Sequence, residues 1–223
     1  MVRKKIKIMD VPYDNQYPIS FSNDFRNAKN TEDIQNIIIR GGNPNMFLND
    51  FMDCPIHYHC YNDNLSIVKY LVENLDVDIN IKNGYDNTPL HIVCSHGYMD
   101  IFDYLVSKGA KLSELNSCKS TPLIQSIICG NIDIVIKLLP LLTKDEICII
   151  DTSGNAAYWA VRCGRLDILY HLTIYGIDLK CLDRNNKTLV DIAKDNGYTH
   201  IIDYLILIPI NYYFQNKSNN VYE

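Results

Sequence analysis

The stretch TPLHIVCSHG at residues 88–97 recurs along the chain at a fixed distance. A second copy, TPLIQSIICG, occupies residues 121–130, and two more degenerate copies, NAAYWAVRCG and TLVDIAKDNG, occupy residues 155–164 and 188–197. Their closing glycines stand at positions 97, 130, 164 and 197, at spacings of 33, 34 and 33 residues. A period of this length indicates stacked copies of one small structural unit.

Two further copies lie upstream and are more degenerate. The stretch CPIHYHCYND at residues 54–63 aligns with the same block and has Asp63 in the place of the glycine. An earlier repeat begins near Phe21 and has Asn30 in that place. The pattern therefore predicts about six repeats. The predicted boundaries are an N-terminal extension at residues 1–19, a single repeat domain at residues 20–206 with repeats near residues 21–49, 50–83, 84–116, 117–150, 151–183 and 184–206, and a C-terminal tail at residues 207–223.

Each repeat carries the signals of two helices. Thr88 is a suitable N-cap, and Pro89 fits the first helical position, where its missing N–H costs nothing. Gly97 is expected to end this helix. Apolar residues spaced i, i+3 and i+4 in residues 101–105 predict a second helix, and the Lys-Gly pair at residues 108–109 is a C-terminal signal.

The second helices and the connections between repeats follow the same pattern. A carboxylate stands near the start of three of the second helices, where the helix dipole favours negative charge. The connections at residues 78–87 and 178–187 are polar and rich in turn residues, so they predict projecting, hairpin-like finger loops. The carboxylates are Asp100, Asp133 and Asp167.

The repeat resembles the ankyrin repeat, whose period and Thr-Pro-Leu-His signature are matched best at residues 88–110. The resemblance covers about residues 21–206. It implies an all-α ankyrin-repeat solenoid of about six helix-turn-helix units with finger loops, and a non-catalytic protein that binds another protein along a concave, loop-fringed face. Residues 155–158 lack the Thr-Pro signature, and residues 140–150 lack the usual Gly-Ala turn. We expect the finger between these two repeats to be irregular.

The composition adds a second resemblance. The Asp- and Asn-rich fingers and the abundance of Ile, Asn, Tyr and Lys look like ankyrin proteins of AT-rich genomes, among them large DNA viruses such as poxviruses. This resemblance implies a viral modulator of host proteins that acts in the cytoplasm of the host cell.

Charge and hydropathy exclude several classes of partner. The net charge is −5 and the sequence pI is about 5.6, which argues against a protein that binds nucleic acid. The basic cluster at residues 3–7 is interpreted as a solvated tail, with a nuclear address as the second interpretation. The apolar run at residues 204–214 is interrupted by Pro209 and is too short to span a membrane, and no secretory signal follows the basic start. We therefore expect a cytoplasmic protein without a membrane partner, with its eight cysteines reduced.

The ankyrin pattern also indicates which residues are free to bind a partner. These are the finger tips and the residues before each glycine, since the Leu, Ile and Ala positions are fixed by stacking. The aromatic members Phe51, Tyr61 and Tyr85 are the expected anchors, because aromatic side chains make large contacts at low entropic cost. The candidate partner-binding residues are Asp50, Phe51, Asp53, Tyr61, Asn62, Tyr85, Asn87, Ser95, His96, Ser117, Ser120, Ile128, Arg162, Arg184, Lys187 and Asp195.

A zinc site is the sharpest chemical alternative. Cysteine and histidine, which zinc favours as ligands, crowd residues 54–60 and recur at residues 91–96. In the ankyrin family, however, the histidine place held by His57 and His91 makes a local hydrogen bond between fingers, and Cys60 and Cys94 hold small-residue helix positions. We therefore expect no metal and no cofactor.

Catalysis and self-association are the two other function classes. Catalysis requires a nucleophile, a base and an orienting group in one pocket, whereas repeats spread polar residues in rows, so no enzyme is expected. A structural subunit that associates with its own copies is the alternative to an independent binding module. The polar first repeat favours a monomer, and the apolar stretch at residues 206–214 would be either a cap on the last repeat or a dimer patch.

Overall fold

The computed structural model describes residues 19–207, in which all regular structure is helical, and this confirms the predicted all-α repeat fold. The chain divides into two compact units, Met1–Pro122 and Leu123–Glu223, here named the N-terminal unit and the C-terminal unit. Almost all of the predicted N-terminal extension and C-terminal tail, including the apolar stretch beyond residue 207, lies outside the described residues. The boundaries assigned to the repeats stay a prediction.

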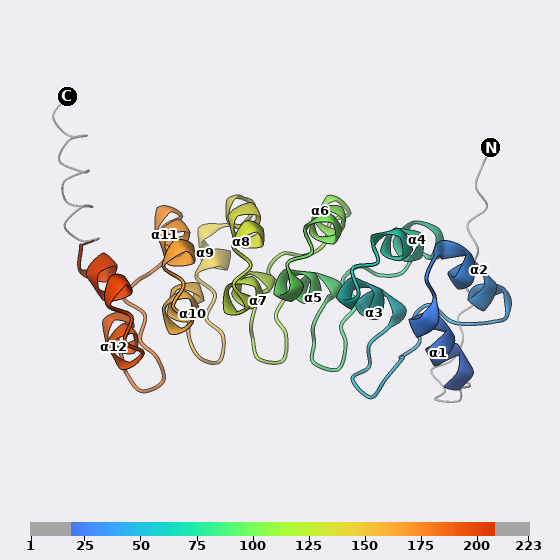
Figure 1. Cartoon of the computed structure of the whole chain (residues 1–223), viewed down its shortest axis with the longest axis horizontal. Helices are drawn as coiled ribbons and strands as arrows, with labels where there is room; N and C mark the ends of the chain where they lie inside the picture. Colours follow the sequence, from blue (N-terminus) through green and yellow to red (C-terminus); the bar gives the residue numbers. More distant parts are fainter. Residues whose placement is uncertain (1–18, 208–223) are drawn as a thin grey trace, which may run out of the picture. The chain divides into compact units, whose positions relative to one another are not determined.

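The described part of the N-terminal unit consists of three helix pairs stacked side by side. The first helices pack on one another, α1 on α3 and α3 on α5, and the second helices do the same, α2 on α4 and α4 on α6. Figure 1 shows the two rows, with long loops extending from the row of α3 and α5 on the side opposite α4 and α6. The pairs are α1 (Ile19–Asn27) with α2 (Thr31–Ile39), α3 (Pro55–Tyr61) with α4 (Leu65–Leu75), and α5 (Pro89–His96) with α6 (Met99–Ser107).

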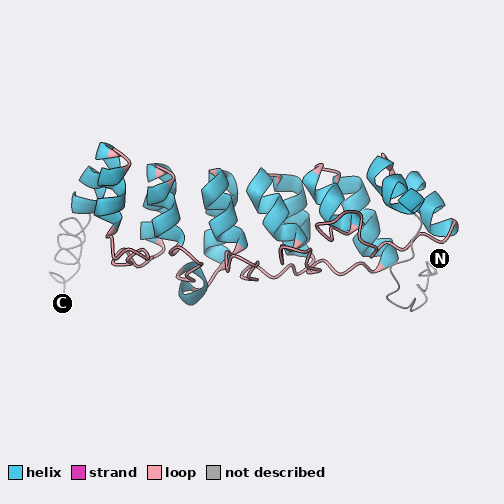
Figure 2. Ribbon diagram, turned by 90° about the horizontal axis from the view of Figure 1, so that it is seen from below, coloured by secondary structure: helices cyan, strands magenta, loops and turns pink. Residues whose placement is uncertain are grey.

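The C-terminal unit also consists of helix pairs, and two short helical segments, η1 and α9, lie between the first pair and the second. Helix α10 packs on α11 and α12, and α11 packs on α8. In each unit the loops between pairs gather along one edge of the helices (Figure 2). The elements are α7 (Pro122–Cys129), α8 (Ile132–Leu138), η1 (Leu139–Leu141), α9 (Lys144–Ile147), α10 (Ala156–Arg162), α11 (Leu166–Ile174), α12 (Leu189–Asp195) and a last helix that begins at residue 199 and is described as far as residue 207.

The interruption lies where the sequence lacks the usual turn, at residues 140–150. A short 3-10 helix, η1, and the one-turn helix α9 fill this stretch. Thr143 and Glu146 form a reciprocal capping box at the start of α9, which satisfies two backbone N–H groups that a short helix would otherwise leave open. The following finger is a tight turn in which the N–H of Asp151 donates to the carbonyl of Gly154. The expected irregularity is present.

Residues in the left-handed region end the first helix of most pairs, as predicted. Gly97 has a φ of 79°, and Asp63 in the glycine place upstream has a φ of 56°. Asn30 differs, because its φ is −150° and its side chain caps the start of α2. Since α1 already ends at Asn27, three residues are available for this turn and none of them has to be left-handed.

The glycines of the C-terminal unit also permit close packing between repeats. A Cβ atom on Gly164 would lie 3.0 Å from the ring of Tyr198, and one on Gly130 would lie 2.2 Å from the guanidinium of Arg165. The side chain that follows one glycine therefore covers the glycine of the preceding repeat. Apolar residues one helical turn apart on the second helices fill the core, among them Ile101, Leu105, Ile134, Leu138, Ile168 and Leu172, which are fully buried.

Candidate partner-binding surfaces

Asparagine side chains shape the finger loops of the N-terminal unit. The Oδ1 atom of Asn83 accepts hydrogen bonds from the backbone N–H groups of Tyr85 and Asn87, each at 3.0 Å. Asn49 and Asn116 make the same pair of bonds in the preceding and following fingers. Local hydrogen bonds therefore fix the tips. Each tip also has one left-handed residue, namely Met52, Asp86 or Lys119.

Backbone hydrogen bonds join neighbouring finger tips in this unit. The N–H of Gly84 donates to the carbonyl of Phe51 at 2.8 Å, and the N–H of Ser117 donates to the carbonyl of Tyr85 at 3.0 Å. This linkage brings two predicted anchors together. The rings of Phe51 and Tyr85 stack with centroids 5.6 Å apart, although 53% of one residue and 51% of the other remain exposed. We call these two residues the finger-tip pair.

A second aromatic group lies at the ends of α3 and α5. The ring of Tyr61 meets that of His96 edge-on at 4.6 Å, and His96 stacks on Tyr98 at 5.4 Å. Tyr61 is 58% exposed, and His96 is also exposed. We call these three residues the helix-end cluster. It stands at the far end of α3 from the finger-tip pair, about 10 Å along the helix axis for seven residues.

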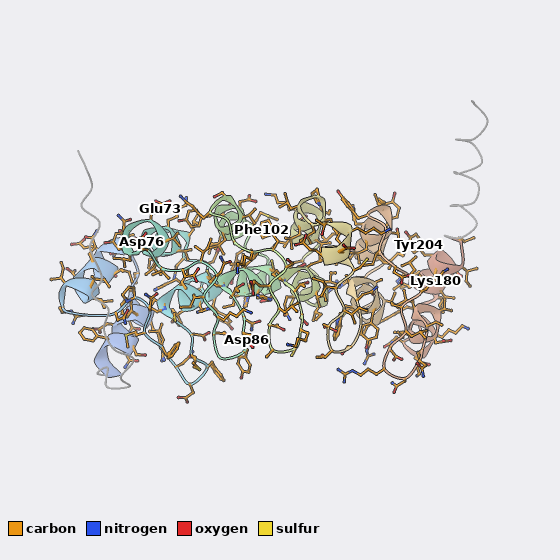
Figure 3. All side chains as sticks on the ribbon, turned by 180° about the vertical axis from the view of Figure 1, so that it is seen from behind. Glu73, Asp76, Asp86, Phe102, Lys180 and Tyr204 are labelled. Carbon is orange, nitrogen blue, oxygen red and sulfur yellow. The ribbon has the colours of Figure 1, made fainter. Side chains whose placement is uncertain are left out.

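The charged residues near these aromatic groups are mostly acidic. Asp50 and Asp86 are exposed at the finger tips, and Asp63 is exposed beside Tyr61. Figure 3 places Asp86 at the end of its loop, remote from Glu73 of the second helix row. Lys119 supplies a positive charge at the tip of the third finger.

Two buried histidines, His57 and His91, each link the first helix of one repeat to the finger of the next repeat by hydrogen bonds. The Nδ1 atom of His91 accepts the N–H of Thr88 at 3.1 Å, and its Nε2–H donates to the carbonyl of Ser120 at 3.1 Å. His57 repeats the pattern one period earlier, with the N–H of Cys54 as the first donor. This is the local hydrogen bond that the family resemblance implies. Burial lowers the pKa of His91 to about 4, so the ring is neutral at pH 7.

The side chains weighed as zinc ligands have other roles in the core. His59 Nε2 lies 3.0 Å from the carbonyl of Phe25, and its Nδ1 lies 3.2 Å from the Nδ2 of Asn64. Burial raises the pKa of the Cys54 thiol to about 12, whereas zinc binds the thiolate. Across residues 19–207, no three His, Cys, Asp or Glu side chains are grouped as ligands for a metal ion.

The C-terminal unit has a pocket lined mainly by polar groups. Its volume is about 290 Å³, and its lining comes from α10, the finger at residues 183–187 and α12. The pocket joins three predicted residues, Arg162, Lys187 and Asp195. The guanidinium of Arg162 donates to Oδ1 of Asn196 at 3.0 Å, and Lys187 forms an ion pair with Asp195 at 2.5 Å. Tyr158 and Ile192 add apolar surface.

Several other predicted residues hold the fingers together. Asp53 accepts a hydrogen bond from the side chain of Asn83 at 2.7 Å, and Asn87 accepts one from Asn116 at 2.9 Å. The prediction that Ser120 is free to bind a partner is wrong. Ser120 is only 2% exposed, and its backbone carbonyl accepts the hydrogen bond from His91. Of the remaining predicted residues, Asp50, Asn62, Ser117 and Arg184 are exposed, and Ser95 and Ile128 are half-buried.

Several residues of these surfaces escaped the sequence prediction. Tyr98 completes the helix-end cluster from the position after Gly97, and Tyr158 and Asn185 line the pocket. Tyr158 stands in the histidine place of the signature, so the departure at residues 155–158 was a signal that could have found it. Asn185 lies in the predicted finger loop at residues 178–187, which was a signal for it, whereas Tyr98 follows Gly97 and lies outside the positions that the ankyrin pattern leaves free.

No helix within residues 19–207 has the length and apolar character needed to cross a lipid bilayer.

Residues 25–116 match the family described as "Ankyrin repeats (3 copies)", and residues 94–139 match "Ankyrin repeats (many copies)". Among curated relatives, the chain is 32% identical over 68% of its length to palmitoyltransferase AKR1 of Lachancea kluyveri, of which the match covers 21%. It is 32% identical over 53% of its length to a transient receptor potential channel A member 1 homolog of Caenorhabditis elegans, of which the match covers 10%.

A viral protein is also similar. The chain is 31% identical over 63% of its length to the ankyrin repeat protein OPG189 of variola virus, of which the match covers 24%. The chain therefore spans less than a quarter of each of these relatives. The repeats of this chain have a period of about 33 residues, paired helices and finger loops. The family matches together with this architecture show that the chain belongs to the ankyrin-repeat family.

Proposed function

We propose that this protein is a non-catalytic module that binds a partner protein through its finger face. In each unit, the finger face consists of the finger tips and the exposed ends of the first helices, which are α3 and α5 in the N-terminal unit and α10 and α12 in the C-terminal unit. Ankyrin repeats are generally protein–protein interaction modules, and the observation that supports this role here is the finger-tip pair. Phe51 and Tyr85 stack across two neighbouring fingers and still present about half of their surface to solvent.

The finger-tip pair is suited to binding because it is held in place before a partner arrives. The backbone bond from Gly84 to Phe51 and the side-chain bonds of Asn83 fix both fingers. Aromatic side chains on an ordered backbone lose little entropy on binding and are frequent binding hot spots. The acidic residues Asp50 and Asp86 beside the rings favour a partner surface with lysine or arginine.

The proposal includes a monomeric chain in the cytoplasm. Similarity to the ankyrin repeat protein of variola virus supports a viral protein that modulates host proteins. The activity in the name of the palmitoyltransferase relative is not proposed for this chain, because the match covers 21% of that protein.

The test is affinity purification of the tagged full chain from its native cells, with quantitative mass spectrometry. One variant carries Phe51→Ala and Tyr85→Ala, and a second carries Tyr61→Ala and His96→Ala. We expect at least one partner to fall about tenfold or more with these variants, because hot-spot aromatic residues contribute that much or more.

Tyr170→Ala is the matched control, since Tyr170 on the second-row helix α11 is 51% exposed, as is Tyr85. It should retain the partner. Partners that persist with both aromatic variants would place the function elsewhere. Light scattering on the purified chain should give a monomer, whereas a dimer would favour the alternative of a self-associating subunit.

A further inference from the structure

The pocket of the C-terminal unit has an arginine whose charge is not matched by a carboxylate. Arg162 stands at the last turn of α10 and uses one guanidinium nitrogen to donate to Oδ1 of Asn196 at 3.0 Å. Asn196 is itself oriented, because its Nδ2 donates to the carbonyl of Ile192 at 2.7 Å. Within residues 19–207, Arg162 forms no ion pair. The guanidinium is therefore held in place with donors left to offer.

Both acidic side chains of the pocket already have partners. Asp195 pairs with the ammonium of Lys187. The Oδ1 atom of Asp183 accepts the backbone N–H groups of Asn185 and Lys187, each at 2.8 Å, and these bonds hold the pKa of its carboxyl below the ordinary value. A carboxylate that has such partners competes weakly for a further cation. Asp183 has no cationic partner, but its Oδ1 atom is already occupied by two N–H donors, so Arg162 is the charged group of the pocket that has donors left to offer a ligand.

The shape of the pocket fits a side chain that carries such an anion. A volume of about 290 Å³ is at the small end of ligand sites and admits one or two amino-acid side chains. Tyr158 provides apolar surface for a short aliphatic stem, and Arg162 provides planar donors that match the two oxygens of a carboxylate.

We propose that this pocket binds a carboxylate of a partner protein, with Arg162 as the group that recognises it. The inference deepens the proposed function, since it rests on the finger face meeting a protein partner. It assigns to the C-terminal unit the recognition of an acidic side chain or a free C-terminus. The N-terminal unit, in contrast, offers aromatic rings and acidic groups.

The test is nuclear magnetic resonance titration of the ¹⁵N-labelled full chain at physiological salt. The probes are three short peptides, Ac-Ala-Glu-Ala-NH₂, Ac-Ala-Gln-Ala-NH₂ and Ac-Ala-Ala-Ala with a free C-terminal carboxylate. We expect the Nε–H signal of Arg162 and the amides of Lys187 and Asp195 to shift with the carboxylate peptides. The glutamine peptide should bind about tenfold more weakly or not at all, because a charge-assisted bond is lost.

Variants distinguish binding at Arg162 from non-specific attraction of the peptide carboxylate to any exposed arginine. Arg162→Gln keeps a long polar side chain and should abolish the shifts, and Arg162→Lys should restore part of them. Arg165→Gln, at another exposed arginine of the same unit, should leave them unchanged. The dispersion of the remaining signals reports whether each variant is folded.

The inference is overturned if the glutamate and glutamine peptides shift the same signals equally, if the shifts survive Arg162→Gln, or if no peptide shifts them. A stronger response to the glutamate peptide identifies a side-chain carboxylate, and a stronger response to the free terminus identifies a C-terminus. Its failure is distinct from that of the proposed function, because the purification experiment depends on Phe51 and Tyr85 of the other unit.

Discussion

The N-terminal and C-terminal units are built from the same repeat, yet they bury and expose different chemistry. The N-terminal unit buries three histidines and exposes stacked aromatic rings beside acidic residues. The C-terminal unit has Tyr158 and Asp191 in the signature histidine place and exposes Arg162 and Lys187 around a pocket. Stacking requires the same apolar positions in both units, so the remaining positions differ freely.

The hydrogen bonds made at the signature histidine position differ between the two units. His91 bonds both to its own helix start and to the next finger, whereas Asp191 bonds to Thr188 of its own helix start. The aspartate retains the cap but lacks the bond to a finger. In the preceding repeat, Asn155 supplies the link instead, because its Nδ2 donates to the carbonyl of Asp178 at 2.9 Å. Among its described residues the C-terminal unit has no buried histidine, and it therefore lacks a buried group that responds to mild acid.

The largest expected difference between the two units is in how their stability responds to acid. Burial lowers the pKa of His57, and it lowers the pKa of His59 and of His91 from 6.5 to about 4, so the unfolded chain binds more protons than the folded chain between these values. Stability of the N-terminal unit should fall as pH drops from about 6.5 to 4, by on the order of 3 kcal/mol for each of His59 and His91 once it is fully titrated. The lowered carboxyl pKa values of Asp183 and Asp191 make the C-terminal unit lose stability only below about 3.8.

Hydrogen exchange with mass spectrometry at pH 7 and pH 5, corrected for intrinsic rates, reports both units in the full chain. Peptides from α3 and α5 should lose protection at pH 5, and those from α10 and α11 should retain it. Equal losses in the two units would mean that the buried histidines do not set the acid sensitivity.

Removal of the histidine itself should have the next largest effect. His91→Ala leaves the N–H of Thr88 and the carbonyl of Ser120 without their buried partner, which should cost on the order of 3 kcal/mol. Asp191→Ala at the equivalent place should cost clearly less, because that side chain is solvent-accessible and serves as a cap. Urea denaturation of each variant measures the difference. A similar loss for both would show that the bond between fingers adds little.

Substitutions at the residue that ends the first helix should change stability in opposite directions in the two units. Gly164→Ala places a side chain at a φ of 70° and against the ring of Tyr198, so a loss of about 1–2 kcal/mol is expected. Asp63→Gly relieves a left-handed aspartate at a φ of 56° and should stabilise the N-terminal unit by less than about 1 kcal/mol. Thermal unfolding of both variants checks the signs, and two changes of the same sign would contradict the assigned backbone roles.

Much of the architecture could be predicted from the sequence because its signals are local. The period of the glycines, the Thr-Pro helix start and the i, i+3, i+4 apolar spacing depend on neighbours within a few residues. The same locality explains the error at Ser120. Its place in a polar finger suggested that Ser120 is exposed. In the structure Ser120 is buried, and its backbone carbonyl accepts a hydrogen bond from the buried ring of His91 in the preceding repeat.

By itself, the sequence determined the repeat, its helices and the class of residues that stacking leaves free. Only the tertiary structure decided which of these free residues meet. Phe51 reaches Tyr85 because a backbone bond joins two fingers, and Arg162 is oriented by Asn196 from the next repeat. These partners are about one period apart in the chain, so no local pattern records their contact. It arises from the stacking of whole repeats, which brings equivalent positions side by side.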